Sequence, residues 1–355
     1  MRCLACLLVS SFAALTAPSA HAQETFIGIA APLSGNFSIL GHQLRDGARL
    51  AAEAGGATAI EADTRCTAEG GEAAARALIG QNVTIVVGFL CTDAIETALP
   101  LFAEAGIPVV TPGVRTATLT DQRERTGWPV FRTAPRADAE RDAVADILVP
   151  RWRENFFAIV DDGTIYGREL AENMRAAAEL QELNPVFIDT FRPQLDNQIG
   201  LAGRLRRAGA THVFVGGDRS DIAILARDAR GMDYELTIAG GEALRAENSS
   251  VPLATGTLMV GLPHWADIVS DDVRQTLEVA GIVPDGYVIP GYAATELAIA
   301  AARQADAEAG SVFDALSSGT FGTALGSLSF DAKGDLNQGF YRLFRFEDQT
   351  FQEVE

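Results

Sequence analysis

The sequence lacks the short motifs that most enzymes use to build a catalytic or cofactor site. Its 355 residues contain no G-x-S-x-G nucleophile elbow, no H-E-x-x-H helix and no phosphate-binding P-loop. Residues 31–35 follow the first expected strand and lack the glycine fingerprint of a dinucleotide site. Histidine is rare, and His42, His212 and His264 lie far apart in the chain. We therefore expect no catalytic residue, no metal site and no cofactor.

Positive charge is also scarce. Lysine and arginine together number 28, against 47 aspartates and glutamates, which gives a formal net charge of −19 at pH 7. Binding to nucleic acid requires a basic surface, and docking on anionic lipid depends on the same kind of charge. We therefore expect neither as a partner, and we interpret the negative charge as a source of solubility.

Long apolar segments are absent, and the N-terminus carries a short one. Residues 3–15 are mostly apolar, Arg2 precedes them, and residues 20–22 read Ala-His-Ala. This apolar run is too short to span a membrane and is typical of a secretory signal peptide. We predict a signal peptide over residues 1–22 and a periplasmic mature chain that begins near Gln23. Two of the four cysteines leave with it.

The two remaining cysteines, Cys66 and Cys91, each follow a segment with the pattern of a β-strand, at 59–63 and 84–87. A helical segment, 71–79, lies between them, so the two strands run parallel and end at the same edge of a sheet. Ligands of open α/β sheets bind at that edge. A disulfide there would contribute roughly 3–4 kcal/mol on the chain-entropy model, and it would be typical of a protein outside the cytosol.

Short apolar strands alternate with amphipathic helices along a chain that is too long for one hydrophobic core. Further strands are expected at 26–30, 108–111, 156–160, 185–190, 212–215, 236–239, 327–330 and 340–346, and further helices at 40–54, 92–104, 136–150, 166–182, 198–208, 221–230 and, after Pro290-Gly291, 292–309. A break near 131–138 separates two stretches of similar build. This pattern predicts the α/β class, with two doubly wound parallel-sheet lobes.

Several motifs, taken together and in order, resemble those of one family. They are Ala31-Pro32-Leu33-Ser34-Gly35, Phe89-Leu90-Cys91-Thr92, Thr111-Pro112-Gly113-Val114, Phe131-Arg132-Thr133, Tyr166-Gly167, Gly216-Gly217, Gly241-Glu242 and the segment Phe330 to Leu336. From Phe26 to about Phe346, the chain resembles the periplasmic solute-binding proteins of branched-chain amino acid ABC transporters, of the Leu/Ile/Val-binding type.

This resemblance implies the type I periplasmic binding protein fold, in which a three-strand hinge joins two lobes that close over a ligand. The lobes would comprise residues 23–134 plus 262–331, and residues 135–261 plus 332–355. Such a protein is not an enzyme. It would capture an amino acid or related small carboxylate and deliver it to an ABC permease at the inner membrane, and we expect a monomer.

The first lobe would contribute Thr92 and the loop Gly113, Val114 and Arg115. Thr92 begins a helix, where free N–H groups favour a ligand carboxylate, and a helix cap without a ligand is the alternative interpretation. The loop corresponds to the one in which the family offers backbone groups to the ligand. An ordinary turn after the fourth strand is the alternative interpretation.

The second lobe would contribute Tyr166 and Glu242. Tyr166 resembles the aromatic residue that closes over the ligand in the family, and a core position is the alternative. Glu242 matches the acidic residue that pairs with the ligand's ammonium group through charge-assisted hydrogen bonds. The alternative for Glu242 is a solvated surface side chain.

Two departures from the family pattern concern the ligand. Arg115 replaces a small hydroxyl residue, and Asp218 and Arg219 lie where binders of aliphatic amino acids carry aromatic residues. An unpaired buried charge is costly. Either Arg115 or Arg219 therefore meets a second anionic group of the ligand, or it pairs with Asp218. We hypothesise a polar or acidic amino acid, or a related small carboxylate, as the ligand.

Three other functions stay open. The same fold could bind an aromatic acid or an amide- or urea-like solute, and Glu242 discriminates because such a ligand has no ammonium group. The chain could also be the ligand-sensing module of a signalling system. A secreted hydrolase is disfavoured by the missing nucleophile motif.

Overall fold

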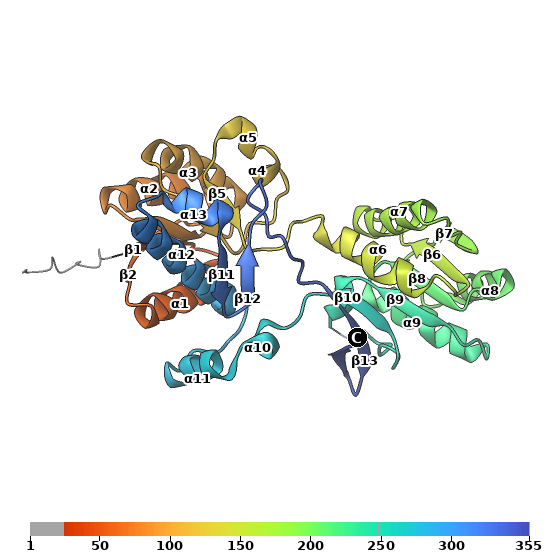
Figure 1. Ribbon diagram of the computed structural model, residues 1–355. Coiled ribbons are helices and arrows are strands. Elements are labelled where there is room, and N and C mark those ends of the chain that lie inside the picture. Colours follow the sequence, from red (N-terminus) through yellow and green to blue (C-terminus); the bar gives the residue numbers. More distant parts are fainter. Residues whose placement is uncertain (1–24, 248, 355) are drawn as a thin grey trace, which may run out of the picture.

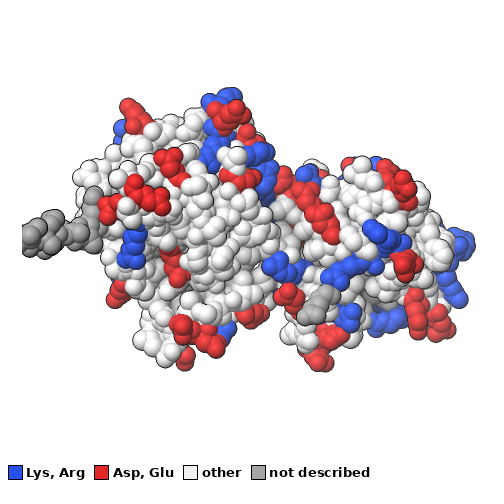
Figure 2. Space-filling model, in the orientation of Figure 1, with Lys and Arg blue, Asp and Glu red and all other residues white. Residues whose placement is uncertain are grey.

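The computed structural model describes residues 25–247 and 249–354, which form two lobes joined by a narrow waist (Figure 1). Each lobe is built around one β-sheet with helices on both faces, which confirms the predicted α/β class. Figure 2 shows acidic and basic side chains on the surface of both lobes. The predicted signal peptide, residues 1–22, lies outside the described residues. Within those described ranges, every helix is too short or too polar to pass through a lipid bilayer.

The sheet of the first lobe has five parallel strands in the order β2-β1-β3-β4-β5. They are β1 (Phe26–Ala31), β2 (Thr58–Asp63), β3 (Ile85–Gly88), β4 (Val109–Thr111) and β5 (Val130–Arg132). The central strand β3 is apolar throughout because both of its faces are covered. Val86 packs toward the helices of one face, and its neighbours Ile85 and Val87 pack toward those of the other.

The helices of the first lobe cover both faces of this sheet. They are α1 (Ser38–Ala54), α2 (Ala68–Gly80), α3 (Thr92–Ala105), α4 (Thr118–Asp121), α5 (Arg123–Thr126), α10 (Trp265–Ile268), α11 (Asp271–Val279), α12 (Val288–Glu308) and α13 (Val312–Ser318). Helices α2 and α3 form one hydrophobic cluster with the sheet, and α12 and α13 form another. A small antiparallel hairpin, β11 (Thr320–Thr323) and β12 (Gly326–Ser329), completes the lobe.

The sheet of the second lobe has seven strands in the order β14-β13-β10-β9-β8-β6-β7. They are β6 (Phe157–Asp161), β7 (Phe187–Thr190), β8 (His212–Gly216), β9 (Thr237–Gly240), β10 (Leu258–Gly261), β13 (Arg342–Glu347) and β14 (Thr350–Glu353). The first five of these run parallel, and β13 and β14 add antiparallel strands at one edge.

The helices of the second lobe also divide between the two faces. Helices α6 (Ala139–Arg151) and α7 (Ile165–Leu180) pack on one face, and α8 (Ile199–Ala208) and α9 (Arg219–Gly231) pack on the other. A short 3₁₀ helix, η1 (Glu242–Arg245), follows β9 on the face of α9.

The chain passes between the lobes three times: after β5, after β10 and between β12 and β13. The first of these passages comprises residues 133–138. A buried ion pair anchors the first and third passages to the first lobe, because Arg132 Nη2 lies 2.6 Å from Asp335 Oδ1. Asp335 Oδ2 also accepts hydrogen bonds from Thr120 and Arg136, each at 2.8 Å.

Among the differences between the fold and the sequence prediction, two concern the start of a long helix and an additional parallel strand. Helix α12 begins at Val288, four residues before the predicted start, and therefore includes Pro290 and Gly291. Proline fits there because the N–H groups of a helix's first turn have no intrahelical acceptor. The second difference is β5, a fifth parallel strand that overlaps the predicted break at 131–138.

Candidate ligand-binding site

The predicted disulfide is present at the C-terminal edge of the first-lobe sheet. Cys66 and Cys91 are bonded, with their Cα atoms 5.2 Å apart. Cys91 occupies the N-cap position of α3, and Thr92 is the first residue of the helix, so Thr92 is not the capping residue. Its hydroxyl instead lies 2.8 Å from the hydroxyl of Thr116. Thr92 therefore presents a hydroxyl beside the free N–H groups of the first turn of α3.

The loop after β4 is folded around the buried hydroxyl of Thr111. This oxygen accepts from the N–H of Val114 at 3.2 Å and of Gly113 at 3.5 Å, and it donates to the Phe89 carbonyl at 3.2 Å. A Cβ at Gly113 would lie 2.3 Å from Leu90 Cδ2, so a side chain there would displace that of Leu90. The side chain of Val114 is only 2% exposed and belongs to the hydrophobic core.

Arg115 points from this loop toward the waist of the molecule. Its Nε donates to the Pro135 carbonyl at 3.2 Å, and its Nη2 donates to the Tyr341 hydroxyl at 2.8 Å. The main-chain carbonyl of Arg115 also accepts from the N–H of Ala137 at 2.8 Å.

The second lobe brings Tyr166 and Glu242 together through a residue that sequence reasoning missed, Glu140. The Tyr166 hydroxyl donates to Glu140 Oε1 at 2.6 Å, and the N–H of Glu242 donates to the same oxygen at 2.7 Å. The Tyr166 hydroxyl in turn accepts from the N–H of Ala243 at 3.3 Å. A Cβ at Gly241 would lie 2.4 Å from Glu140 Oε1 and 2.5 Å from the Tyr166 hydroxyl, so a side chain there would displace this pair.

Burial dominates the electrostatics of this cluster. It raises the pKa of Glu140, and the nearby charge of Glu242 raises it further. The hydrogen bond from Tyr166 and the charge of Arg115 act in the opposite direction. The pKa of the Tyr166 hydroxyl is raised by burial and then by the Glu140 carboxylate, so Tyr166 stays a hydrogen-bond donor at neutral pH.

Glu242 is neither fully solvated nor fully buried. It begins η1, its side chain is 23% exposed, and its Oε1 accepts from the N–H of Leu262 at 3.1 Å. The Nε of Arg245 lies 3.9 Å from the same oxygen.

The clue to Glu140 in the sequence is an acidic residue in the first turn of the first helix after the domain break.

Asp218 and Arg219 lie apart from this cluster. Asp218 is exposed at the N-cap position of α9 and makes no capping hydrogen bond. The guanidinium of Arg219 donates to the Leu244 carbonyl and lies 5.3 Å from the centre of the Phe346 ring. Phe346 packs on the α8 and α9 face of the sheet, whereas Tyr166 packs on the α6 and α7 face. The structure thus gathers Tyr166, Glu140 and Glu242. Arg219 lies beside Phe346, on the opposite face of the second-lobe sheet from Tyr166.

A small cavity of about 170 Å³ lies where the first-lobe loop meets the waist. Gly113 and Arg115 line it, together with Pro112, Thr133, Ala134, Pro135, Leu262, Trp265, Gly286, Tyr287, Pro290 and Leu325. This cavity therefore joins the predicted ligand-binding loop of the first lobe to two of the passages between the lobes.

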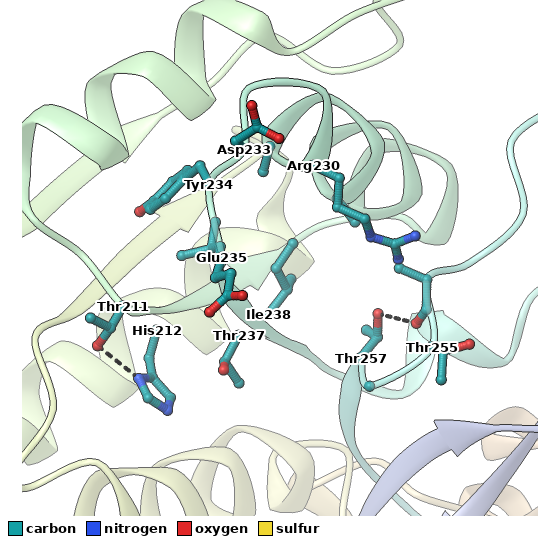
Figure 3. Close-up of a pocket in the computed structure, with 15 residues that line it drawn as sticks. Thr211, His212, Arg230, Asp233, Tyr234, Glu235, Thr237, Ile238, Thr255 and Thr257 are labelled. Atoms are coloured by element: carbon teal, nitrogen blue, oxygen red, sulfur yellow. Dashed lines mark hydrogen bonds between the residues drawn. The ribbon is translucent and has the colours of Figure 1, made fainter.

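A larger hollow, of about 790 Å³, lies at the opposite end of the second lobe (Figure 3). Residues at the starts of β8 and β9 line it, including Thr211, His212 and Thr237. The Thr211 hydroxyl lies 2.9 Å from His212 Nδ1. In open parallel sheets ligands bind at the C-terminal edge of the strands, so this hollow is not the candidate site. Within the described ranges, no cluster of three or more His, Cys, Asp or Glu side chains could hold a metal ion.

The sequence is similar to named amino-acid-binding proteins over almost its whole length. The Leu/Ile/Val-binding protein homolog 3 of Brucella melitensis is 28% identical over 348 residues, which cover 94% of each chain. The leucine-, isoleucine-, valine-, threonine- and alanine-binding protein of Pseudomonas aeruginosa is 23% identical, and the match covers 99% of this chain and 97% of that one. These are names of binding proteins and not of enzymes.

Solved structures share the fold. The ABC transporter substrate-binding protein of Desulfitobacterium hafniense in complex with Leu has a TM-score of 0.64 and 20% identity, covering 94% of this chain and all of that one. A solute-binding protein of an ABC transporter from R. palustris, in complex with benzoate, has a TM-score of 0.56 and 17% identity, covering 93% and 95%. Residues 24–350 match the family model described as periplasmic binding protein. The chain therefore belongs to the periplasmic binding protein family.

Proposed function

We propose that this protein captures an amino acid, or a related small carboxylate, between its lobes and delivers it to an ABC importer of the inner membrane. Family membership over residues 24–350 supports this function, as do relatives named for binding leucine, isoleucine and valine. The observation that carries the proposal is the complementary polarity of the two lobes. The first lobe offers hydrogen-bond donors and the second offers carboxylates.

In this proposal the first lobe binds the ligand's carboxylate. The Thr92 hydroxyl and the first turn of α3 supply donors and a favourable helix dipole. The loop from Gly113 to Arg115 forms the adjacent wall. The Val114 side chain is in the core, so only the backbone of that residue would contact the ligand.

The second lobe would bind the ammonium group. Glu242 and Glu140 each have a carboxylate oxygen in addition to the one that accepts main-chain or Tyr166 hydrogen bonds. A charge-assisted bond from an ammonium group to such an oxygen is about twice as strong as a neutral hydrogen bond. Tyr166 would cover the ligand with its ring while its hydroxyl holds Glu140 in place.

We also propose that the mature protein is periplasmic and monomeric, and that it reaches the periplasm through cleavage of a signal peptide over residues 1–22. The Cys66–Cys91 disulfide supports an oxidising compartment.

The second candidate function is binding of an aromatic acid, and a structural relative in complex with benzoate supports it. The amide- or urea-like solute and the ligand sensor remain further proposals within the same fold. Glu242 separates amino acids from aromatic acids, because a ligand without an ammonium group gives its carboxylate no partner.

A thermal-shift screen of the mature, disulfide-intact protein tests the proposal. The panel contains L-leucine, L-threonine, L-glutamate, benzoate, 4-hydroxybenzoate, acetamide and urea. A ligand at about a thousand times its dissociation constant stabilises the folded state by roughly 4 kcal/mol, which raises the melting temperature by several degrees or more.

We expect amino acids to raise the melting temperature and Glu242→Gln to abolish most of that rise. Glu278→Gln is the matched control, because Glu278 is exposed on α11. A rise with benzoate that is insensitive to Glu242→Gln would favour the aromatic acid, and no rise with any compound would contradict the proposed function.

A further inference from the structure

Arg115 belongs to the first lobe, yet its side chain bonds to the waist and to the second lobe. Two of its nitrogens donate to the Pro135 carbonyl and the Tyr341 hydroxyl. The main-chain carbonyl of Arg115 accepts from the N–H of Ala137, so its main chain and its side chain both bond to the first passage between the lobes. One residue thus contacts the first and third passages between the lobes.

The residues on either side of Arg115 are held rigidly in the first lobe. On one side of Arg115 in sequence, the Val114 side chain is buried in the core. On the other side, the Thr116 carbonyl accepts from Arg132 Nη1 at 2.6 Å, and the Thr116 hydroxyl contacts Thr92. Arg132 is fully buried in the first lobe. The loop therefore moves with the first lobe and cannot follow a rotation of the second.

The partner of Arg115 in the second lobe is held rigidly as well. Tyr341 lies directly before β13, is 6% exposed and packs into the core cluster that includes Val144 and Leu148 of α6. The bond from Arg115 to Tyr341 therefore joins two rigid bodies, and a change in the angle between the lobes must stretch or break it. By contrast, the second passage is bonded to the second lobe, where Leu262 donates to Glu242 and accepts from Arg245.

We propose that Arg115 is a positioning residue that holds the angle between the lobes through its bonds to Pro135 and Tyr341. Because Arg115 is part of the loop that lines the proposed ligand site, a ligand seated against that loop would act directly on the bonds that hold the angle. This role of Arg115 does not depend on which solute the protein binds.

The test measures the distance distribution between spin labels on the two lobes, at the exposed positions Glu104 of α3 and Glu172 of α7. The protein is the mature chain without ligand, with the Cys66–Cys91 disulfide intact. The variants are Tyr341→Phe, which removes one hydroxyl, and Arg115→Lys, which keeps the positive charge but loses the planar fork that reaches two acceptors.

The control variant is Tyr287→Phe. Tyr287 lines the same small cavity as Arg115, and its hydroxyl makes no hydrogen bond to another described residue. Tyr287→Phe removes a tyrosine hydroxyl from the same cavity without breaking a hydrogen bond of Arg115.

We expect Tyr341→Phe and Arg115→Lys to change the ratio of lobe conformations by about 2- to 10-fold, which is the effect of one net hydrogen bond on an equilibrium constant. Tyr287→Phe should leave the distribution unchanged. Distributions that match wild type in both Tyr341→Phe and Arg115→Lys would overturn the proposal. The result is independent of the ligand screen, so a failure here leaves the proposed function untouched, and the reverse also holds.

Discussion

Glu140 is the residue at which stability and ligand binding oppose each other most directly. Its carboxylate is placed beside that of Glu242, and burial raises its pKa above the ordinary value of 4.5. A carboxyl group whose pKa is higher in the folded than in the unfolded protein binds more protons when folded. It therefore favours folding at low pH, and this contribution is lost as the pH rises through the folded-state pKa.

Glu140→Gln should remove this pH dependence. The amide oxygen of glutamine can still accept from Tyr166 and from the N–H of Glu242, so the local structure should persist. Urea unfolding at pH 4.5, 5.5 and 7 should show the variant gaining stability relative to wild type as the pH rises, while its affinity for amino acids falls. The same substitution at the exposed Glu169 is the control. A stability difference that is constant across the three pH values would contradict this assignment.

At the scale of elements, the disulfide fixes the loop that leads into α3. Replacing both cysteines by serine should lower the free energy of unfolding by roughly 3–4 kcal/mol, because the unfolded chain regains the freedom of the loop. Thermal unfolding with and without reductant measures the effect on the wild-type protein, and reductant should not change the melting temperature of the double variant. Equal melting temperatures for oxidised and reduced wild type would contradict the prediction, because the disulfide would then not stabilise the folded protein.

The elements that the sequence predicts well are those whose period and end signals agree. Helix α3 begins at Thr92 as predicted, and β8 begins at His212 as predicted. Helix α12 begins four residues before the predicted start, because a first-turn proline costs no hydrogen bond and Pro290 therefore fits inside the helix. Strand β5, with three residues, is too short to show a period, and only its place beside β4 makes it a strand.

The candidate site was predictable only in part, for a related reason. Thr92, Tyr166 and Glu242 stand in motifs, so a resemblance could locate them. Glu140 lies in no motif, and its importance comes from the tertiary contacts to Tyr166 and Glu242. The role of Arg115 was likewise hidden, because its partner Tyr341 is 226 residues away in sequence.

At the scale of the whole molecule, a buried ion pair anchors two of the passages between the lobes to the first lobe. Arg132 is fully buried, and Asp335 is the carboxylate that neutralises it. Asp335→Asn should destabilise the protein by about 3–5 kcal/mol, since it leaves the buried guanidinium without its counter-charge. Asp271→Asn, which breaks a surface ion pair to Arg274, should cost no more than about 1 kcal/mol. Urea unfolding compares the two, and similar losses for both would contradict the structural role of the buried pair.

We propose that a small solute binds between the lobes and brings them together. Small-angle X-ray scattering of the mature protein tests this most directly, with and without a saturating concentration of the compound that most raises its melting temperature. We expect a smaller radius of gyration with the solute, and no decrease in a Glu242→Gln variant that no longer binds it. A solute that binds wild type tightly but leaves the radius of gyration unchanged would contradict capture by lobe closure.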